Sequence, residues 1–171
     1  VPVSRIELCT AISEGGLTPP LSLIEKVCRE SKVPVHVMVR PRRGDFLYSS
    51  DEFELMKADI RHAANTGAAG VVFGILRDDG SIDRERCREL IEIAGPLHTT
   101  FHRAFDMSID PFFALEEIIA IGCNTLLTSG QRQTAEDGLE LIREIIKRAA
   151  NRIEIMAGGG INQDNVLLLF E

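Results

Sequence analysis

Short apolar runs alternate with amphipathic stretches along the whole chain. Six runs rich in β-branched residues have the length of strands, at about 4–9, 34–40, 69–74, 99–103, 124–128 and 153–157. Between and after them, apolar residues recur at helical spacing over about 20–30, 51–65, 83–93, 111–121, 135–150 and 163–170. Successive strands are separated by roughly the length of a βα unit. The pattern therefore predicts one α/β domain over residues 1–171.

Six consecutive βα units predict a wholly parallel sheet with helices outside it. Both an open doubly wound sheet and a barrel satisfy this pattern. Long polar loops follow the strands, at 10–19, 41–50, 75–82 and 129–134. Such loops are typical of the carboxyl face of a TIM (β/α)8-type barrel, so we favour the barrel. A complete barrel has eight units, and we expect this one to be truncated to about six.

The net charge and the cysteines limit the classes of partner and the cellular compartment that we expect for this chain. The net charge is −7 over 171 residues, with fewer basic than acidic residues, which argues against a nucleic-acid partner. No apolar run approaches the roughly 20 residues that span a bilayer, so we expect no membrane partner. The four cysteines form no Cys-x-x-Cys pair, which indicates a reducing compartment, the cytoplasm. We expect Cys28 and Cys87 to be small core residues, because both lie on apolar helical stripes.

Strand parity separates the inner from the outer side chains. The β-branched set at 33, 35, 37 and 39 suits a face covered by helices, which leaves His36, Met38 and Arg40 inside. The same reasoning places Glu7, Cys9 and His102 inside. We expect Glu7, Cys9, Arg40 and His102 to share one layer at the carboxyl ends of the strands. Buried charges need partners, so a structural ion pair between Glu7 and Arg40 explains them as well as a functional pocket does.

The segment 99–106 combines a strand with His102, Arg103 and Asp106 at its end. Ionisable residues at strand carboxyl ends often carry the chemistry of parallel α/β folds. His102 has an ordinary pKa near neutrality and suits a general acid or base. Glu7 and Asp106 are the candidate carboxylates beside it. A hydrogen-bonded core histidine is the alternative interpretation of His102.

The last strand is followed by Gly158, Gly159 and Gly160. Glycines at this position let backbone N–H groups approach an anion, and the corresponding loop of TIM barrels belongs to their usual phosphate site. Guanidinium groups of Arg40, Arg42 and Arg103, with Ser129 on a neighbouring loop, would complete an anion-binding rim. A tight turn and a solvated loop are the alternatives.

Together these residues resemble the CutC family, which is named for copper homeostasis. The resemblance runs from Arg5 to the end of the chain and is carried by the blocks 5–9, 14–19, 37–48, 56–60, 72–74, 79–83, 100–107, 127–130 and 156–161. It implies a TIM barrel, a cytoplasmic location, homo-oligomers and Cu(I) handling. The family begins with a further βα unit whose strand ends in its own cysteine. Relative to the family, this chain lacks that unit and the C-terminal end of the barrel.

Two functions follow as expectations. In the first, the chain handles Cu(I), with Cys9 as the metal ligand, because Cu(I) prefers thiolate and thioether ligands. In the second, it is an enzyme that acts on a small anionic metabolite, phosphorylated or carboxylated. His102, Glu7 and Asp106 would then supply acid–base chemistry while the anion-binding rim holds the substrate. No organic cofactor is indicated in either case.

Overall fold

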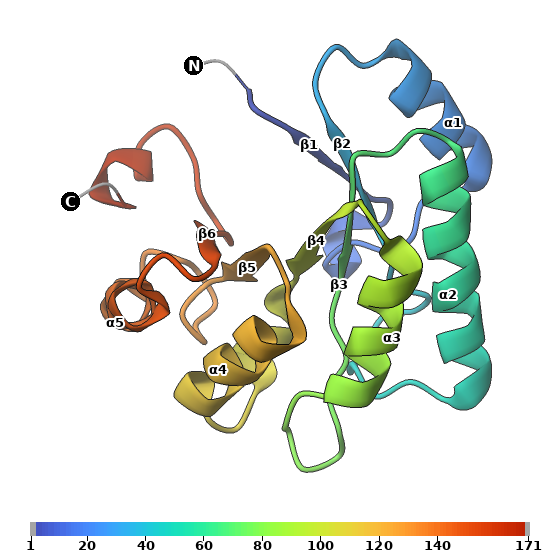
Figure 1. The fold of residues 1–171 in the computed structure, drawn as a ribbon. Helices are drawn as coiled ribbons and strands as arrows, with labels where there is room; N and C mark the ends of the chain where they lie inside the picture. The colour runs from blue at the N-terminus through green and yellow to red at the C-terminus, as the bar shows by residue number, and fades with distance from the viewer. Residues whose placement is uncertain (1–2, 170–171) are drawn as a thin grey trace.

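Six parallel strands form one sheet, in the order in which they occur in the chain. The computed structural model describes residues 3–169. The strands are β1 (Ile6–Leu8), β2 (Val35–Met38), β3 (Gly70–Phe73), β4 (His98–Phe101), β5 (Thr125–Thr128) and β6 (Glu154–Ala157). Figure 1 shows that the sheet curves from β1 to β6 and is open between them. The predicted truncated barrel is confirmed.

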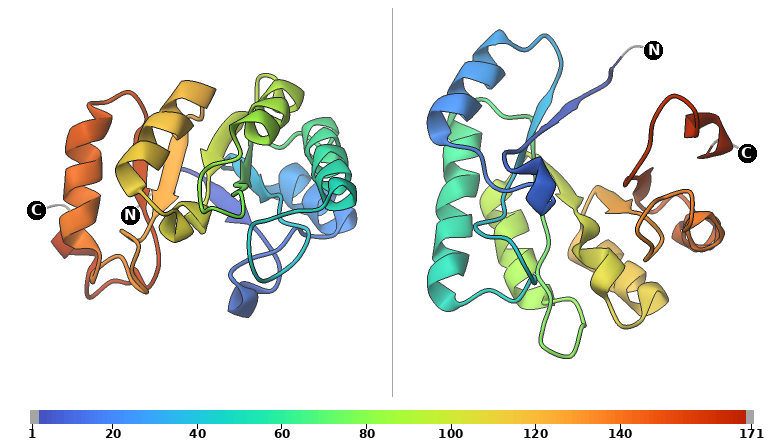
Figure 2. Two further views of the ribbon diagram at one scale, coloured as in Figure 1. Left: turned by 90° about the horizontal axis from the view of Figure 1, so that it is seen from below. Right: turned by 180° about the vertical axis from the view of Figure 1, so that it is seen from behind.

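All five α-helices lie on the outer side of the curved sheet (Figure 2). They are α1 (Leu21–Glu30), α2 (Ser50–Asn65), α3 (Arg84–Ala94), α4 (Pro111–Ile121) and α5 (Leu139–Ala149). Three short 3₁₀ helices follow strands or end the described chain: η1 (Ile12–Glu14), η2 (Arg103–Met107) and η3 (Val166–Leu169). Within residues 3–169, no helix is long and apolar enough to cross a lipid bilayer.

Two helix predictions need correction. The helix expected from residue 135 begins only at Leu139, because the backbone of Gly138 packs directly against the carbonyl of Ser129. The helix expected over 163–170 is replaced by η3, and Phe170 lies outside the described residues. The side chain of Asn162 accepts hydrogen bonds from the backbone N–H groups of Asp164 and Asn165. These bonds cap one turn at Asn162, which the bond from the N–H of Val166 to the Asn162 carbonyl closes, and the chain continues from there as η3.

Side-chain capping fixes where the longer helices begin. The Ser49 hydroxyl accepts from the N–H of Glu52, while the Glu52 carboxylate accepts from the N–H of Ser49, which is a capping box for α2. Asp110 caps α4 in a similar way, with Pro111 in the first turn. These caps set the lengths of the loops that precede the helices.

The hydrophobic core lies between the sheet and the helices. Outward side chains of successive strands, Val37, Phe73, Phe101 and Leu126, are fully buried there. The inner face is different in kind, since His36, Thr100 and His102 are buried on it. Apolar outward and polar inward residues agree with the strand parity of the sequence. The inner face therefore holds the buried polar side chains from which a site can be built.

The cysteines of α1 and α3 differ more than the sequence predicts. Cys87 is fully buried, as expected, and burial raises the pKa of its thiol well above the usual value. Cys28 is only half-buried, contrary to its predicted core position. The Cys87 Sγ donates a hydrogen bond to the Ile75 carbonyl at 4.0 Å. A serine hydroxyl has a shorter bond to Cβ and would leave its oxygen too far from this carbonyl to form the bond.

We therefore expect Cys87→Ser to lower the free energy of unfolding by about 1–3 kcal/mol, because it buries an unsatisfied hydroxyl. Cys28→Ser is the matched control and should change it by no more than about 0.5 kcal/mol. Denaturant unfolding followed by circular dichroism measures both. Equal effects of the two substitutions would contradict this assignment of the core.

Candidate functional site

The strand register arranges the inner side chains in successive rows. Glu7 of β1 pairs directly with His36 of β2. Arg40 lies beyond the end of β2, two rows further toward the carboxyl edge than His36. His102 is at the same edge, because a Cβ on Gly74 would lie 2.6 Å from its Nδ1. The predicted single layer of Glu7, Cys9, Arg40 and His102 is therefore wrong: Glu7 lies two rows and Cys9 one row below Arg40.

Glu7 belongs to a polar network in the lower half of the half-barrel. Its Oε1 lies 3.7 Å from Arg5 Nε, and Arg5 Nη1 lies 3.3 Å from the Glu154 carboxylate. Thr125 joins Glu154 to His98 by contacts of 2.6 and 2.8 Å. Burial raises the pKa of the Glu7 carboxyl, and the charge of Arg5 opposes that shift. Arg5 thus takes the place that sequence reasoning gave to Arg40, and it also links β1 to β6.

Two sulfur-bearing side chains, Cys9 and Met38, lie against Gly16 one row above Glu7. A Cβ built on Gly16 would lie 3.3 Å from Cys9 Sγ and 3.4 Å from Met38 Cε. Gly16 has φ +89°, so the loop after β1 folds over this pair in a conformation that favours glycine. Burial and the negative charge of Glu7 raise the pKa of the Cys9 thiol. Met156 lies elsewhere, with its Sδ 2.9 Å from Arg5 Nη2.

Arg40 ties two loops together at the carboxyl edge. Its Nη1 donates to the carbonyls of Glu14 and Gly16, at 2.8 and 3.2 Å. Its Nη2 donates to the Gly44 carbonyl at 3.0 Å. Arg40 is 6% exposed, and its guanidinium carbon lies 4.8 Å from the ring centroid of Phe46. No carboxylate forms an ion pair with this buried cation within residues 3–169.

His102 is held by a backbone hydrogen bond and is covered by the ring of Phe46. Its Nδ1 accepts from the N–H of Ala104 at 3.2 Å, which places the ring proton on Nε2. The Phe46 ring lies 5.0 Å away, centroid to centroid. Burial and the charge of Arg40 lower the pKa of His102 to about 3. The imidazole is therefore neutral at physiological pH, with Nε2–H available as a donor.

Asp106 holds the loop after β5. Its carboxylate, 7% exposed, accepts from Arg103 Nε at 2.8 Å and from the Thr128 hydroxyl at 2.5 Å. It also accepts from the N–H groups of Ser129 and Gln131 and from the Ser129 hydroxyl. So many donors leave the carboxylate little capacity for acid–base chemistry. The structure gives Asp106 a positioning role, which sequence reasoning did not foresee.

Arg103 faces the glycine run after β6. Its Nη2 donates to Ser129 Oγ at 2.7 Å and to the Arg132 carbonyl at 3.1 Å. Its Nη1 would lie 3.2 Å from a Cβ on Gly159, and it has no hydrogen-bond acceptor in the described chain. The N–H groups of Gly159 and Gly160 likewise donate to no acceptor within residues 3–169, whereas that of Gly158 bonds to Thr128.

Arg42 is not available to this rim. Its Nε donates to Glu52 at 2.6 Å, and its other nitrogens donate to Asp45 and to backbone carbonyls of the same loop. These bonds, the one to Asp45 foremost, raise the pKa of its guanidinium. The side chain therefore shapes the 41–49 loop. Arg103, Ser129, Gly159 and Gly160 form the anion-binding candidate that the structure brings together.

No group of three or more histidine, cysteine, aspartate or glutamate residues could hold a metal ion in the described part of the chain. The sulfur pair of Cys9 and Met38 fits a soft ion such as Cu(I) better than a hard one. The sequence predicts that Met38 points inward but does not pair it with Cys9. The signal that identifies it is its register, one row above His36 on the same face.

Comparison with known proteins gives one consistent family. The CutC family model matches residues 2–171. The chain is 51% identical over 167 residues to the human copper homeostasis protein cutC homolog, and 47% identical over 170 residues to a family protein CutC of Glaesserella parasuis. These matches cover 98% and 99% of this chain, but 61% of the human and 70% of the bacterial protein. The chain therefore spans about three fifths of the human relative.

Solved structures agree on the architecture. A crystal structure of a CutC protein from Streptococcus agalactiae superposes with a TM-score of 0.93 at 32% identity, covering 98% of this chain and 83% of that one. An aldolase superposes with a TM-score of 0.68 at 16% identity, covering 88% and 70%. The second likeness concerns the fold alone.

The hydrogen bonds of Asp106 lead to a prediction with a matched control. Asp106→Asn should lower the free energy of unfolding by at least about 2 kcal/mol, because its amide N–H₂ would face N–H donors. Asp110→Asn should change it by less than about 0.5 kcal/mol, since asparagine caps a helix as well as aspartate does. Thermal and denaturant unfolding measure both. An unchanged free energy of unfolding in Asp106→Asn would contradict the positioning role of Asp106.

Proposed function

The chain belongs to the CutC family, and from that premise we propose that it binds and handles Cu(I) in the cytoplasm through Cys9 and Met38. The observation that carries this proposal is that both sulfur-bearing side chains lie against Gly16. The human and mouse relatives are named copper homeostasis proteins, which supports copper as the ion. All four cysteines are free thiols, in keeping with a reducing compartment.

The chemistry of the pair suits a soft monovalent ion. A thiolate and a thioether are preferred Cu(I) ligands, and neither requires a rigid octahedral shell. Copper must displace the Cys9 proton, and the raised pKa of this thiol makes that step harder at low pH. The negative charge of Glu7 disfavours a free thiolate, but it attracts a cation to the same place. Cu(I) affinity is therefore expected to rise with pH.

Substitution of each sulfur tests the copper site. Cys9→Ser should lower Cu(I) affinity at least about tenfold, and Met38→Leu should lower it by a smaller factor, because the thiolate is the stronger ligand. Cys28→Ser, a half-buried cysteine on α1, is the matched control and should leave the affinity unchanged. The measurement is a competition titration against a chromophoric Cu(I) chelator under reducing conditions.

Unchanged affinity in Cys9→Ser would overturn the copper site. Equal losses in Cys9→Ser and Cys28→Ser would indicate nonspecific thiol binding and would overturn it as well. Circular dichroism on each variant separates loss of a ligand from loss of the fold.

A second function is favoured by the N–H donors of Arg103, Gly159 and Gly160 that have no acceptor within residues 3–169. They suit a phosphate or carboxylate of a small anionic metabolite, on which the chain would act as an enzyme. His102 and Glu7 remain the candidate acid–base groups. They lie in different rows, so a substrate would need to bridge them. Asp106 would position Arg103 rather than touch the substrate.

Titration with inorganic phosphate tests this anion site. The amide resonances of Gly159 and Gly160 should shift in a saturable way, because neither N–H group has an acceptor within residues 3–169. Arg103→Gln should weaken binding about tenfold through loss of a charge-assisted hydrogen bond. Arg152→Gln, whose guanidinium is paired with Glu116 on the outer side, should have no effect. Unshifted glycine amides would refute the site.

A further inference from the structure

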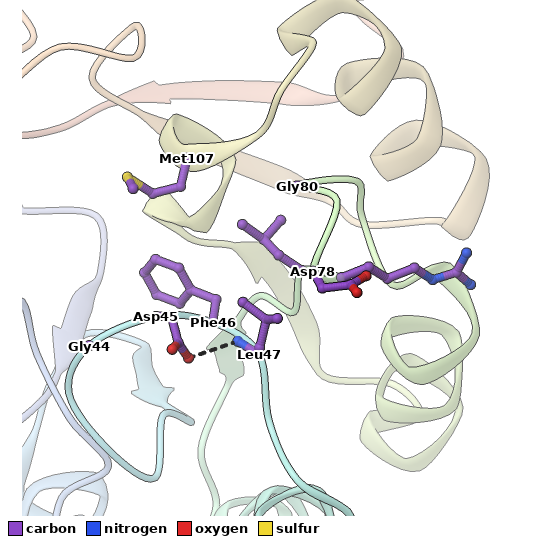
Figure 3. Close-up of a pocket in the computed structure, with 9 residues that line it drawn as sticks. Gly44, Asp45, Phe46, Leu47, Asp78, Gly80 and Met107 are labelled. Atoms are coloured by element: carbon purple, nitrogen blue, oxygen red, sulfur yellow. Dashed lines mark hydrogen bonds between the residues drawn. The ribbon is translucent and has the colours of Figure 1, made fainter.

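An apolar groove lies beside the buried cluster of Arg40 and His102. It has a volume of about 400 Å³ and is lined by the loops after β2 and β3 and by the end of η2. Figure 3 shows Phe46 and Leu47 on one side and Met107 on the other. Arg77, Asp45 and Asp78 supply the charged groups of its lining, and Asp45 is paired with Arg42. A groove of this size suits a small apolar molecule.

Two hydrogen-bond donors lie unused behind that groove. His102 Nε2 and Arg40 Nε are both buried and form no hydrogen bond within residues 3–169; the Tyr48 hydroxyl, which also forms none, lies beside the Arg40 guanidinium. His102 is 3% exposed and Arg40 6% exposed. Buried donors without an acceptor cost free energy, so native structures rarely keep them without a reason. Arg40 is a cation without a carboxylate partner, and His102 lies beside it. An anionic oxygen is therefore the acceptor that suits both donors.

Phe46 separates the donors from the groove. Its ring stacks on the Arg40 guanidinium and lies 5.0 Å from the His102 ring, centroid to centroid. The same residue lines the groove. It lies in the 41–49 loop, which has no regular secondary structure over these residues and is fixed to Arg40 through Gly44. Within residues 3–169, Phe46 is therefore the one side chain that contacts the groove, the Arg40 guanidinium and the His102 ring.

We propose that this groove binds a carboxylic acid with an apolar body, whose carboxylate displaces Phe46 and accepts hydrogen bonds from Arg40 Nε and His102 Nε2. The apolar body would lie against Leu47, Leu76 and Met107. Arg40 supplies the charge, and the fixed tautomer of His102 supplies the second donor. This site is separate from the Cys9–Met38 pair and from the Arg103 rim, so it stands independently of the copper proposal, whereas it shares His102 with the proposed enzyme function.

Octanoate and octanol provide a matched pair of probes, because they share a chain and differ in the head group. Isothermal titration below the micelle concentration should show saturable octanoate binding at least about tenfold tighter than octanol. Affinity should fall from octanoate to hexanoate and be lost with acetate, because the apolar body contributes burial. Equal binding of octanoate and octanol, or equal binding of octanoate and acetate, would overturn the proposal.

Two substitutions separate the head group from the groove. His102→Asn keeps an oxygen acceptor for the N–H of Ala104 but removes the Nε2 donor. It should weaken octanoate about tenfold and leave octanol unchanged. Met107→Ser removes part of the groove wall and should weaken both probes. Met107 is 68% exposed, so this change spares the core.

Cys9→Ser serves as the control, because it removes the copper ligand without touching the groove. It should bind octanoate as the native chain does, which keeps failure of the copper proposal distinct from failure of this one. Native octanoate affinity in a folded His102→Asn variant would overturn the role of His102. Absence of any saturable octanoate binding would overturn the site.

Discussion

The buried charge of Arg40 is the constraint on which the carboxyl face of the half-barrel depends. A guanidinium at 6% exposure must be satisfied by hydrogen bonds, and three backbone carbonyls from two loops provide them. The loop after β1 is thereby drawn over the sheet, which brings Gly16 against Cys9 and Met38. The loop after β2 is held in the same way, which places Phe46 against both Arg40 and His102. One cation thus fixes the sulfur pair and the aromatic cover together.

Asp106 does the same on the other half of the sheet with the opposite charge. Its carboxylate collects donors from η2 and from the loop after β5, and it orients Arg103 toward Gly159. Charged groups are therefore used at this face mainly to order loops that have no secondary structure of their own. Three donors at this face have no hydrogen-bond acceptor within residues 3–169 and so remain available to ligands: Arg103 Nη1, Arg40 Nε and His102 Nε2.

Local patterns in the sequence are sufficient to predict the strands, most helices and the polar inner face, because each depends on residues close together in the chain. The stagger between strands is different. Glu7 and Arg40 both point inward, yet β1 pairs with β2 in a register that places Glu7 beside His36, and no local signal encodes that shift. Asp106 looked catalytic for a related reason. Its donors come from residues 128–131, whose position is known only once the sheet has formed.

The protonation states of the inner face follow from the same burial. The pKa of His102 is lowered to about 3 and that of His36 to about 4, below the ordinary value near 6.5. Between these values and 6.5 the unfolded chain binds more protons than the folded one, so stability increases with pH across that window. Above it both imidazoles are neutral and contribute no further pH dependence. At neutral pH Arg40 is therefore the cation beside His102, which is why an anionic oxygen would find one charge and one neutral donor there.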